Sequence, residues 1–318
     1  MKVNLSLANR VNTKRVPAYV WQFVRLVMII GISYVILLPL MSKLVSTFMQ
    51  EADAYDPTVR WIPKHFTFAN LRIAWEYMEY PKAFGMSLLI ALSVTVLQLA
   101  SCTMIGYGLA RFNFRGRHIW FGIVVFMLVV PPQLIHTPLY LNFRFFDLFG
   151  LIPGGGVNLI NTPWPLALLA ITGTGYKNGL FIFIARQYFR GMPKELEESA
   201  YVDGAGAIQT FIRIMVPGAV PILIVIFLFS FVWQWNDSYF IMMYMGERNV
   251  LPVALTQFVT RYFVEMSGLS AQQFVLSVPY ASVLESAGML LFVAPLLILY
   301  TFAQRFFIES VERTGIVG

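Results

Sequence analysis

The sequence predicts an all-α integral membrane protein with six transmembrane helices and both termini in the cytoplasm. Its 318 residues are 58% hydrophobic and only 12% charged, and its mean hydropathy is +0.68. Soluble domains carry about 25% charged residues, so this chain has too few to solvate its surface in water. Lipid is therefore expected to cover most of the exterior, and basic residues near the apolar stretches indicate which ends face the cytoplasm.

Charge-free stretches long enough to cross a bilayer, which takes about 20 apolar residues, recur along the chain. Residues 148–176 also lack charge, but their first half, "LFGLIPGGGVNLINTPWP", has the Gly and Pro density of a loop. That span is therefore placed at 164–189, with Lys177 inside it. The apolar stretches assigned to helices are 26–42, 83–110, 118–143, 164–189, 214–236 and 286–304.

Lysine and arginine set the predicted orientation, because they concentrate in cytoplasmic loops. They are dense before the first span, in "ARFNFRGRH" (110–118) and around 186–213, and sparser in the intervening loops. The resulting organisation has a cytoplasmic segment 1–19, span one at 20–43 and an outer loop at 44–83. A core at 84–318 contains a cytoplasmic loop at 190–217, a long polar outer loop at 237–282 and a cytoplasmic tail at 305–318.

One polar segment, "ELEESAYVDGAGAIQTFIRIMVP" (195–217), lies between two predicted spans. Pro193 suits the start of a helix, and the glutamates that follow suit the positive end of its dipole. Gly204 lies where that helix would end, and a second helix is expected to begin near Ala207 and enter span five at Pro217. Local physics leaves two interpretations open: a solvated helix that only joins two spans, or a surface presented to a partner.

The spacing within this segment resembles the EAA signature of ABC importer permeases. It consists of Glu198-Ser199-Ala200, then Gly204, then Ile214 and Val216-Pro217, with Ser and Val in place of the usual Ala and Leu. Further stretches resemble the carbohydrate-type branch that includes the second maltose permease subunit. These are "GLARFNFRGR" (108–117), "VVPPQLIHTPLYL" (129–141), "RQYFRGMPKELEESAYVDGA" (186–205), "WQWND" (233–237) and "LYTFAQRFFIE" (299–309). The resemblance covers roughly 84–318 and implies a bacterial or archaeal cell membrane.

The resemblance also implies partners and residue roles. The EAA loop would be a coupling helix that seats in a groove of a cytoplasmic ATPase dimer, with Glu198 paired to a basic residue there. The outer loop before the last span would meet an extracytoplasmic solute-binding protein, and the tail would reach the ATPase. A second permease subunit would complete a heterodimer. The expected coupling residues are Glu195, Glu198, Ser199, Ala200, Asp203, Gly204, Ala205 and Pro217.

Motifs for catalysis or cofactor binding are absent from the sequence. It has no phosphate-cradling loop, so ATP and Mg are expected in the partner ATPase and no cofactor in this chain. Its three histidines lack metal-ligand spacing, and no catalytic constellation stands out. The net charge of +7 comes without a basic helix or aromatic platform, which argues against a nucleic-acid partner. We therefore expect a non-catalytic subunit.

Polar side chains inside spans are costly and mark candidate solute contacts. Trp233 and Trp235 could instead belong to an interfacial aromatic belt, and Lys177 could reach the outer interface. The alternatives to an ABC permease are an ATP-independent transporter or channel, or a membrane anchor; the solute could be an oligosaccharide, a glycerol phosphate or another polar metabolite. The candidate pathway residues are Gln98, Gln133, His136, Lys177, Trp233, Gln234 and Asn236.

Overall fold

The computed structural model describes residues 18–131, 134–147, 150–152, 156–246, 248–268 and 278–315, and this part of the chain is almost entirely helical. Two isolated antiparallel bridges, Met49 to Phe66 and Phe146 to Val157, are the non-helical pairings among these residues. The helices are α1 (Ala18–Thr47), α2 (Glu51–Ala54), α3 (Ala69–Tyr77), α4 (Tyr80–Arg111), α5 (Arg117–Val129), α6 (His136–Arg144), α7 (Trp164–Ile171), α8 (Asn178–Gly191), α9 (Glu195–Val202), α10 (Ala207–Thr210), the π-helical turn η2 (Phe211–Met215), α11 (Val216–Gly218), α12 (Val220–Trp235), α13 (Tyr239–Met245), α14 (Leu251–Ser267) and α15 (Val278–Gly315).

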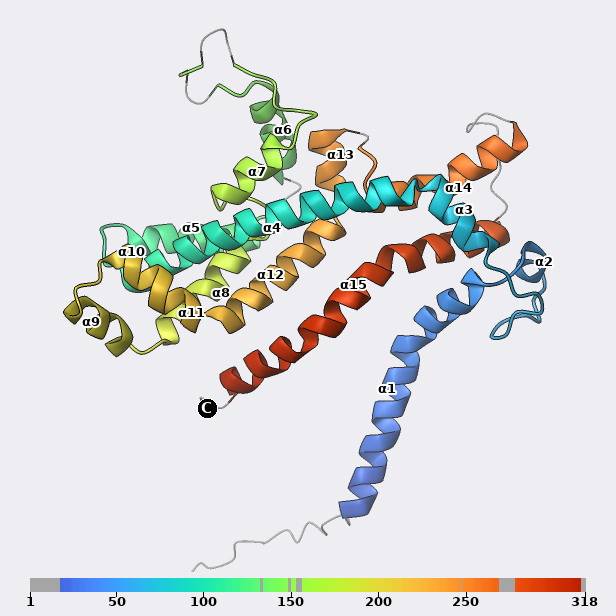
Figure 1. Cartoon of the computed structure of the whole chain (residues 1–318), viewed down its shortest axis with the longest axis horizontal. Helices are drawn as coiled ribbons and strands as arrows, with labels where there is room; N and C mark the ends of the chain where they lie inside the picture. Colours follow the sequence, from blue (N-terminus) through green and yellow to red (C-terminus); the bar gives the residue numbers. More distant parts are fainter. Residues whose placement is uncertain are drawn as a thin grey trace, which may run out of the picture.

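The core is built around α4, which packs against α7, α8, α12 and α14. α12 lies between α4 and α15, and the three long helices run side by side (Figure 1). α9 lies at one end of the molecule, and α3 and α14 lie at the other. α1 packs against α15, but most of its length stands apart from the other helices. A partner or lipid must cover α1, because its side chains are apolar and exposed.

Three described helices are long and apolar enough to cross a membrane: Val20–Thr47, Tyr80–Arg111 and Pro279–Gln304. A fourth span results if Ala207–Gly218 and Val220–Trp235 count as one broken helix, bent by 79°. The bend in predicted span five lies between Pro217 and Pro221, and each of these prolines lacks a backbone N–H. The all-α membrane class is confirmed, whereas the count of six and the cytoplasmic termini stay predictions.

Predicted span three (118–143) is wrong as one continuous helix. α5 ends at Val129, and Val130 is extended with ψ 121° before Pro131; α6 begins only at His136. A residue that precedes proline is disfavoured in the helical region, which accounts for the break. The motif "VVPP" carried this information, but the absence of charge across it concealed the interruption.

Predicted span four (164–189) is also broken. α7 ends at Ile171 and α8 begins at Asn178, and between them Gly173 and Lys177 have positive φ of 70° and 69°. Glycine adopts this conformation at the least cost, and a Cβ on Gly173 would also lie 2.5 Å from Ile105 Cδ1, so a larger residue would have to displace the end of that side chain. The break places Lys177 at the N-terminal end of α8 instead of inside a helix.

The predicted outer loop 237–282 contains packed helices. Residues 237–282 include α13 and α14, and Leu251 and Phe258 of α14 are fully buried. The description of this region as a polar loop is therefore wrong, because the apolar face of α14 packs against α3 and α15. Within this region, residues 269–277 and the side chain of residue 278 lie outside the described part of the chain.

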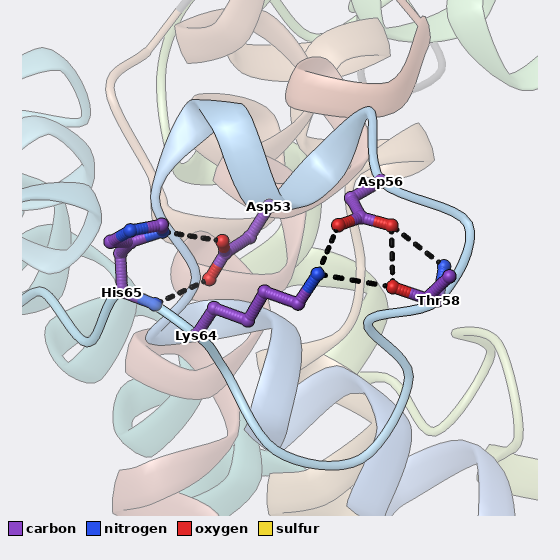
Figure 2. A network of polar contacts seen from close by, with 5 residues as sticks. All are labelled: Asp53, Asp56, Thr58, Lys64 and His65. Carbon is purple, nitrogen blue, oxygen red and sulfur yellow. Dashed lines mark hydrogen bonds and ion pairs between the residues drawn. The ribbon is translucent and has the colours of Figure 1, made fainter.

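A network of polar contacts links residues between 53 and 65, within the predicted outer loop 44–83 (Figure 2). The buried Asp53 carboxylate accepts the backbone N–H of His65 at 2.8 Å and contacts the His65 ring Nδ1 at 2.8 Å. Lys64 lies eight positions after Asp56, and its ammonium holds the pKa of the Asp56 carboxyl well below its usual range. Thr58 also donates to Asp56 through its hydroxyl and backbone N–H. These contacts tie the loop between α2 and α3 to its own start.

The close crossing of α4 and α8 yields a stability prediction. A Cβ on Gly106 would lie 2.6 Å from Ala185 Cβ and 2.9 Å from the backbone nitrogen of Arg186. Gly106→Ala should therefore push the two helices apart and lower the free energy of unfolding by about 1–3 kcal/mol. Gly108→Ala is the matched control, because nothing lies within 4 Å of its Cβ. Thermal unfolding in detergent compares them; equal midpoints would contradict the packing described here.

Candidate functional site

The polar segment at 190–217 forms the short helix that its sequence predicted. α9 begins at Glu195, directly after Pro193 and Lys194, and carries three glutamates in its first turn. Glu195, Glu198 and Ser199 are exposed, whereas Ala200 is buried. The acidic side chains lie at the positive end of the helix dipole, which stabilises them there. α9 thus presents an acidic face and buries the opposite one.

Gly204 terminates α9 as expected. Its φ is +82°, its N–H donates to the carbonyl of Tyr201 at 3.1 Å, and the N–H of Ala205 donates to the carbonyl of Ala200 at 2.9 Å. This pair of bonds is a Schellman motif, which requires a left-handed residue at the glycine position. Nothing lies within 4 Å of a Cβ built on Gly204, so backbone conformation alone explains the glycine. Asp203 precedes the turn and is exposed.

The buried face of α9 is anchored by Glu197, which sequence reasoning missed. This side chain is 8% exposed; its Oε1 accepts the hydroxyl of Tyr107 at 2.7 Å, and its Oε2 lies 3.4 Å from Arg111 Nε. Arg111 also donates to the carbonyl of Met192 at 2.6 Å, just before α9. Helical spacing could have paired Glu197 with Ala200 on one face, and Tyr107 with Arg111 on α4. No sequence signal links the two pairs.

The exposed surface of α9 and α10 combines charge with large apolar side chains. Val202 is 87% exposed and Ile208 is 76% exposed, close to Glu198 along the chain. Below α9, the Tyr107 ring packs against Phe211 of η2, with ring centroids 4.7 Å apart. α9 packs on the core through one face, while Val202 of α9 and Ile208 of α10 are exposed to solvent. Exposed apolar side chains next to charged ones are typical of a docking surface. Pro217, the last predicted coupling residue, is exposed in α11, and Ala205 is half-buried.

A cavity of about 480 Å³ brings together the predicted pathway residues. α4, α6, α7, α8, α12 and α13 contribute to its wall, together with the chain around 175–177. Gln133 lies outside the described residues. The others, Gln98, His136, Lys177, Trp233, Gln234 and Asn236, all line it. The structure therefore gathers side chains from distant parts of the sequence, and their role in solute passage stays a prediction.

Gln98 lies at the junction of three helices. Its Nε2 donates to Asn178 Oδ1 of α8 at 2.5 Å, and its Oε1 accepts the Ser230 hydroxyl of α12 at 2.6 Å. Gln234 Nε2 donates to the same Gln98 oxygen at 3.4 Å. With 2% exposure, Gln98 mainly holds α4, α8 and α12 together beneath the cavity.

His136 and Gln234 each keep a side-chain atom free for a further hydrogen bond within the described part of the chain. His136 Nδ1 lies 2.9 Å from the hydroxyl of Tyr239, while its Nε2 has no hydrogen-bond partner among the described residues. The side-chain oxygen of Gln234 is likewise unpaired within the described part of the chain. Buried polar atoms are normally satisfied, so such groups next to a cavity are candidates to bind a ligand. Asn236, by contrast, is exposed and donates to the carbonyl of Val232 at 2.7 Å.

The two tryptophans of "WQWND" have different environments. Trp235 is 1% exposed and donates its indole N–H to the carbonyl of Phe292 on α15 at 3.3 Å, so it is a core residue and does not belong to an interfacial belt. Trp233 lines the cavity and is half-buried. The Lys177 ammonium lies 4.8 Å from the centroid of the Trp233 ring and 4.5 Å from that of Tyr176. Lys177 therefore points into the cavity among aromatic rings.

Metal-binding geometry does not occur in the described ranges: no three His, Cys, Asp or Glu side chains gather as a ligand set there. The single cysteine, Cys102, is fully buried in α4. The arrangement is suited to contacting a polar solute and a protein partner through aromatic, amide and charged groups.

Comparison with known proteins identifies the family. The family described as "Binding-protein-dependent transport system inner membrane component" matches residues 102–313. The probable ABC transporter permease protein YurM of Bacillus subtilis is 26% identical over 306 residues, covering 94% of this chain and 88% of that protein. The arabinooligosaccharides transport system permease protein AraQ of Halalkalibacterium halodurans is 26% identical over 300 residues, covering 90% and 93%.

A solved structure shares the fold. It is a bacterial ABC transporter involved in the import of the acidic polysaccharide alginate, with a TM-score of 0.70 and 19% identity, covering 91% of this chain and 97% of that chain. The family model spans most of the helical core that contains α9 and the cavity. The chain therefore belongs to the family of binding-protein-dependent transport system inner membrane components, and it is a multi-pass permease subunit of an ABC importer in the cell membrane.

Proposed function

We propose that this permease subunit carries an oligosaccharide and that ATP hydrolysis in a partner drives it through α9. Relatives named for arabinooligosaccharide transport and diacetylchitobiose uptake support a sugar as solute. The cavity supports it chemically, because Trp233 and Tyr176 offer aromatic faces beside the amides of Gln234 and Asn236. Sugar rings pack on aromatic faces, and amides bind their hydroxyls.

The observation that carries the coupling role is the two-sided character of α9. One face is fixed to α4 through Glu197, Tyr107 and Arg111, and the other exposes Glu198 and Val202. In this proposal the exposed face seats in a groove of a cytoplasmic ATPase dimer, where Glu198 meets a basic residue. ATP and Mg act in that ATPase, and this chain is a non-catalytic subunit of the transporter.

The proposed mechanism is alternating access, in which groups of helices move as nearly rigid bodies. A displacement of α9 passes to α4 because the buried ion pair and the hydroxyl bond resist separation. α4 in turn packs against α8 and α12, which line the cavity with Lys177 and Trp233 at their ends. A sister permease subunit supplies the other half of the pathway, and an extracytoplasmic solute-binding protein delivers the sugar.

The association with an ATPase tests this function. Purification of the affinity-tagged chain in mild detergent should recover a second permease and an ATPase, and the complex should hydrolyse ATP. Deletion of residues 193–206 should release the ATPase while the second permease stays bound. An ATP-independent transporter or channel would instead purify without any ATPase, and retention of the ATPase by the deleted chain would contradict the docking role.

A further inference from the structure

The Lys177 ammonium in the cavity wall is not ion-paired within the described part of the chain. Lys177 lines it as an ammonium that contacts two aromatic rings and has no carboxylate within salt-bridge distance among the described residues. The ion pairs among the described residues lie outside the cavity, in the segment 53–82 and between Arg111 and Glu197. Aromatic faces stabilise a cation only partly, so this ammonium remains able to bind an anion.

Asp237 is the acidic side chain in the same described wall. Its carboxylate accepts the backbone N–H of Phe240 at 3.0 Å. Burial raises the pKa of Asp237 to about 6, so this carboxyl is still mostly ionised at neutral pH. The imidazole of His136, also in this wall, lies within hydrogen-bond distance of the Tyr239 hydroxyl through Nδ1. Lys177 and Asp237 therefore bring opposite charges to the described wall but form no ion pair, so the Lys177 ammonium has no carboxylate partner among these residues.

The backbone at Lys177 indicates that its position is specified. Its φ of +69° belongs to the left-handed region, which glycine or asparagine adopts at lower cost than lysine. Strained residues of this kind cluster at ligand sites, where the surrounding structure holds them. Lys177 also caps α8, whose N-terminal backbone dipole adds positive potential at the same place.

We infer that Lys177 binds a carboxylate of the solute, so that the transported sugar is acidic. One unpaired ammonium matches one carboxylate, whereas a phosphate monoester would carry about −1.5 to −2 charges into a wall that already holds Asp237. The adjacent aromatic and amide groups would contact the rest of the sugar. This inference rests on the proposed role of the cavity as a solute pathway.

A charge-sensitive labelling experiment tests the inference in the intact transporter. Thr137 lines the cavity and is exposed, so Thr137→Cys supplies a reporter thiol, while the native Cys102 is fully buried. The rates of modification by an anionic and a cationic methanethiosulfonate of similar size give a ratio. Lys177→Gln should lower the anionic-to-cationic ratio about tenfold. Lys177→Arg should preserve it, and Lys82→Gln, which removes an exposed lysine outside the cavity, should leave it unchanged.

Protection of the same thiol identifies the sugar class. Digalacturonate should slow the labelling of Thr137→Cys more than neutral digalactose does, and Lys177→Gln should abolish that difference. Equal protection by the two sugars, including none, or an unchanged labelling ratio in Lys177→Gln, would overturn the inference. Both results leave the recovery of an ATPase with the tagged chain unaffected, so failure of the inference is distinguishable from failure of the proposed function.

Discussion

Glu198→Lys should reduce solute uptake roughly 30-fold or more while the chain still inserts into the membrane. Truncating or reversing one member of a desolvated charge pair at an interface costs about 2–5 kcal/mol of binding free energy. Glu198 is exposed in the isolated chain, so its replacement removes no internal contact that stabilises α9. The loss should therefore appear in ATPase binding and uptake, and not in the folding of this chain. Uptake of radiolabelled solute in cells measures the effect.

The control for this substitution lies on the same helix. Ser199 is exposed and its hydroxyl donates to the carbonyl of Leu196 at 3.2 Å, so Ser199→Ala changes α9 without altering its charge. Uptake should stay within about twofold of the original. Equal uptake by Glu198→Lys and Ser199→Ala, at equal amounts in the membrane, would show that Glu198 has no part in coupling.

Glu197→Ala should detach α9 from the transmembrane core. It removes the acceptor for the Tyr107 hydroxyl and leaves the Arg111 guanidinium buried without its carboxylate. Breaking a buried pair in this way costs about 3–5 kcal/mol. The variant should bind the ATPase but transmit its movement poorly, so that ATP hydrolysis persists while uptake falls. Hydrogen exchange of the α9 amides, measured beside both activities, should rise in the same variant.

A double replacement separates the loss of contact from the burial of an unpaired charge. Glu197→Leu with Arg111→Met should restore much of the stability, because well-packed apolar residues often substitute for a buried ion pair. Glu195→Ala, on the exposed face, serves as the matched single control. Protection of α9 in Glu197→Ala equal to that in Glu195→Ala would contradict the anchoring described here.

Features that depend on local chemistry were predictable from the sequence. Pro193 and Gly204 bracket α9, because each acts on the backbone next to it. α4 and α15 were recognisable because long apolar stretches require a helix in lipid, where backbone groups have no water to bind. The polar residues of the cavity were recognised individually, since a polar group in an apolar stretch carries a cost that needs an explanation.

Features that depend on distant contacts were not predictable. Glu197 resembled its two neighbouring glutamates, and only the approach of Tyr107 and Arg111, about ninety residues earlier in the chain, buries it. α14 looked like a polar loop because its apolar residues are spaced for one buried face and not for a span. The breaks near Pro131 and Lys177 are marked locally by proline and glycine, but the charge-free stretches that run across them are typical of a continuous span.

The central claim is that the exposed face of α9 contacts an ATPase in the assembled transporter. A photoreactive benzoylphenylalanine at Val202, which is 87% exposed at the end of α9, tests it directly in intact membranes. The account predicts a cross-link to the ATPase from position 202 and none from position 35, where Val35 is 69% exposed on α1. A membrane-inserted complex that yields no ATPase cross-link from position 202, or an equal yield from position 35, would contradict it.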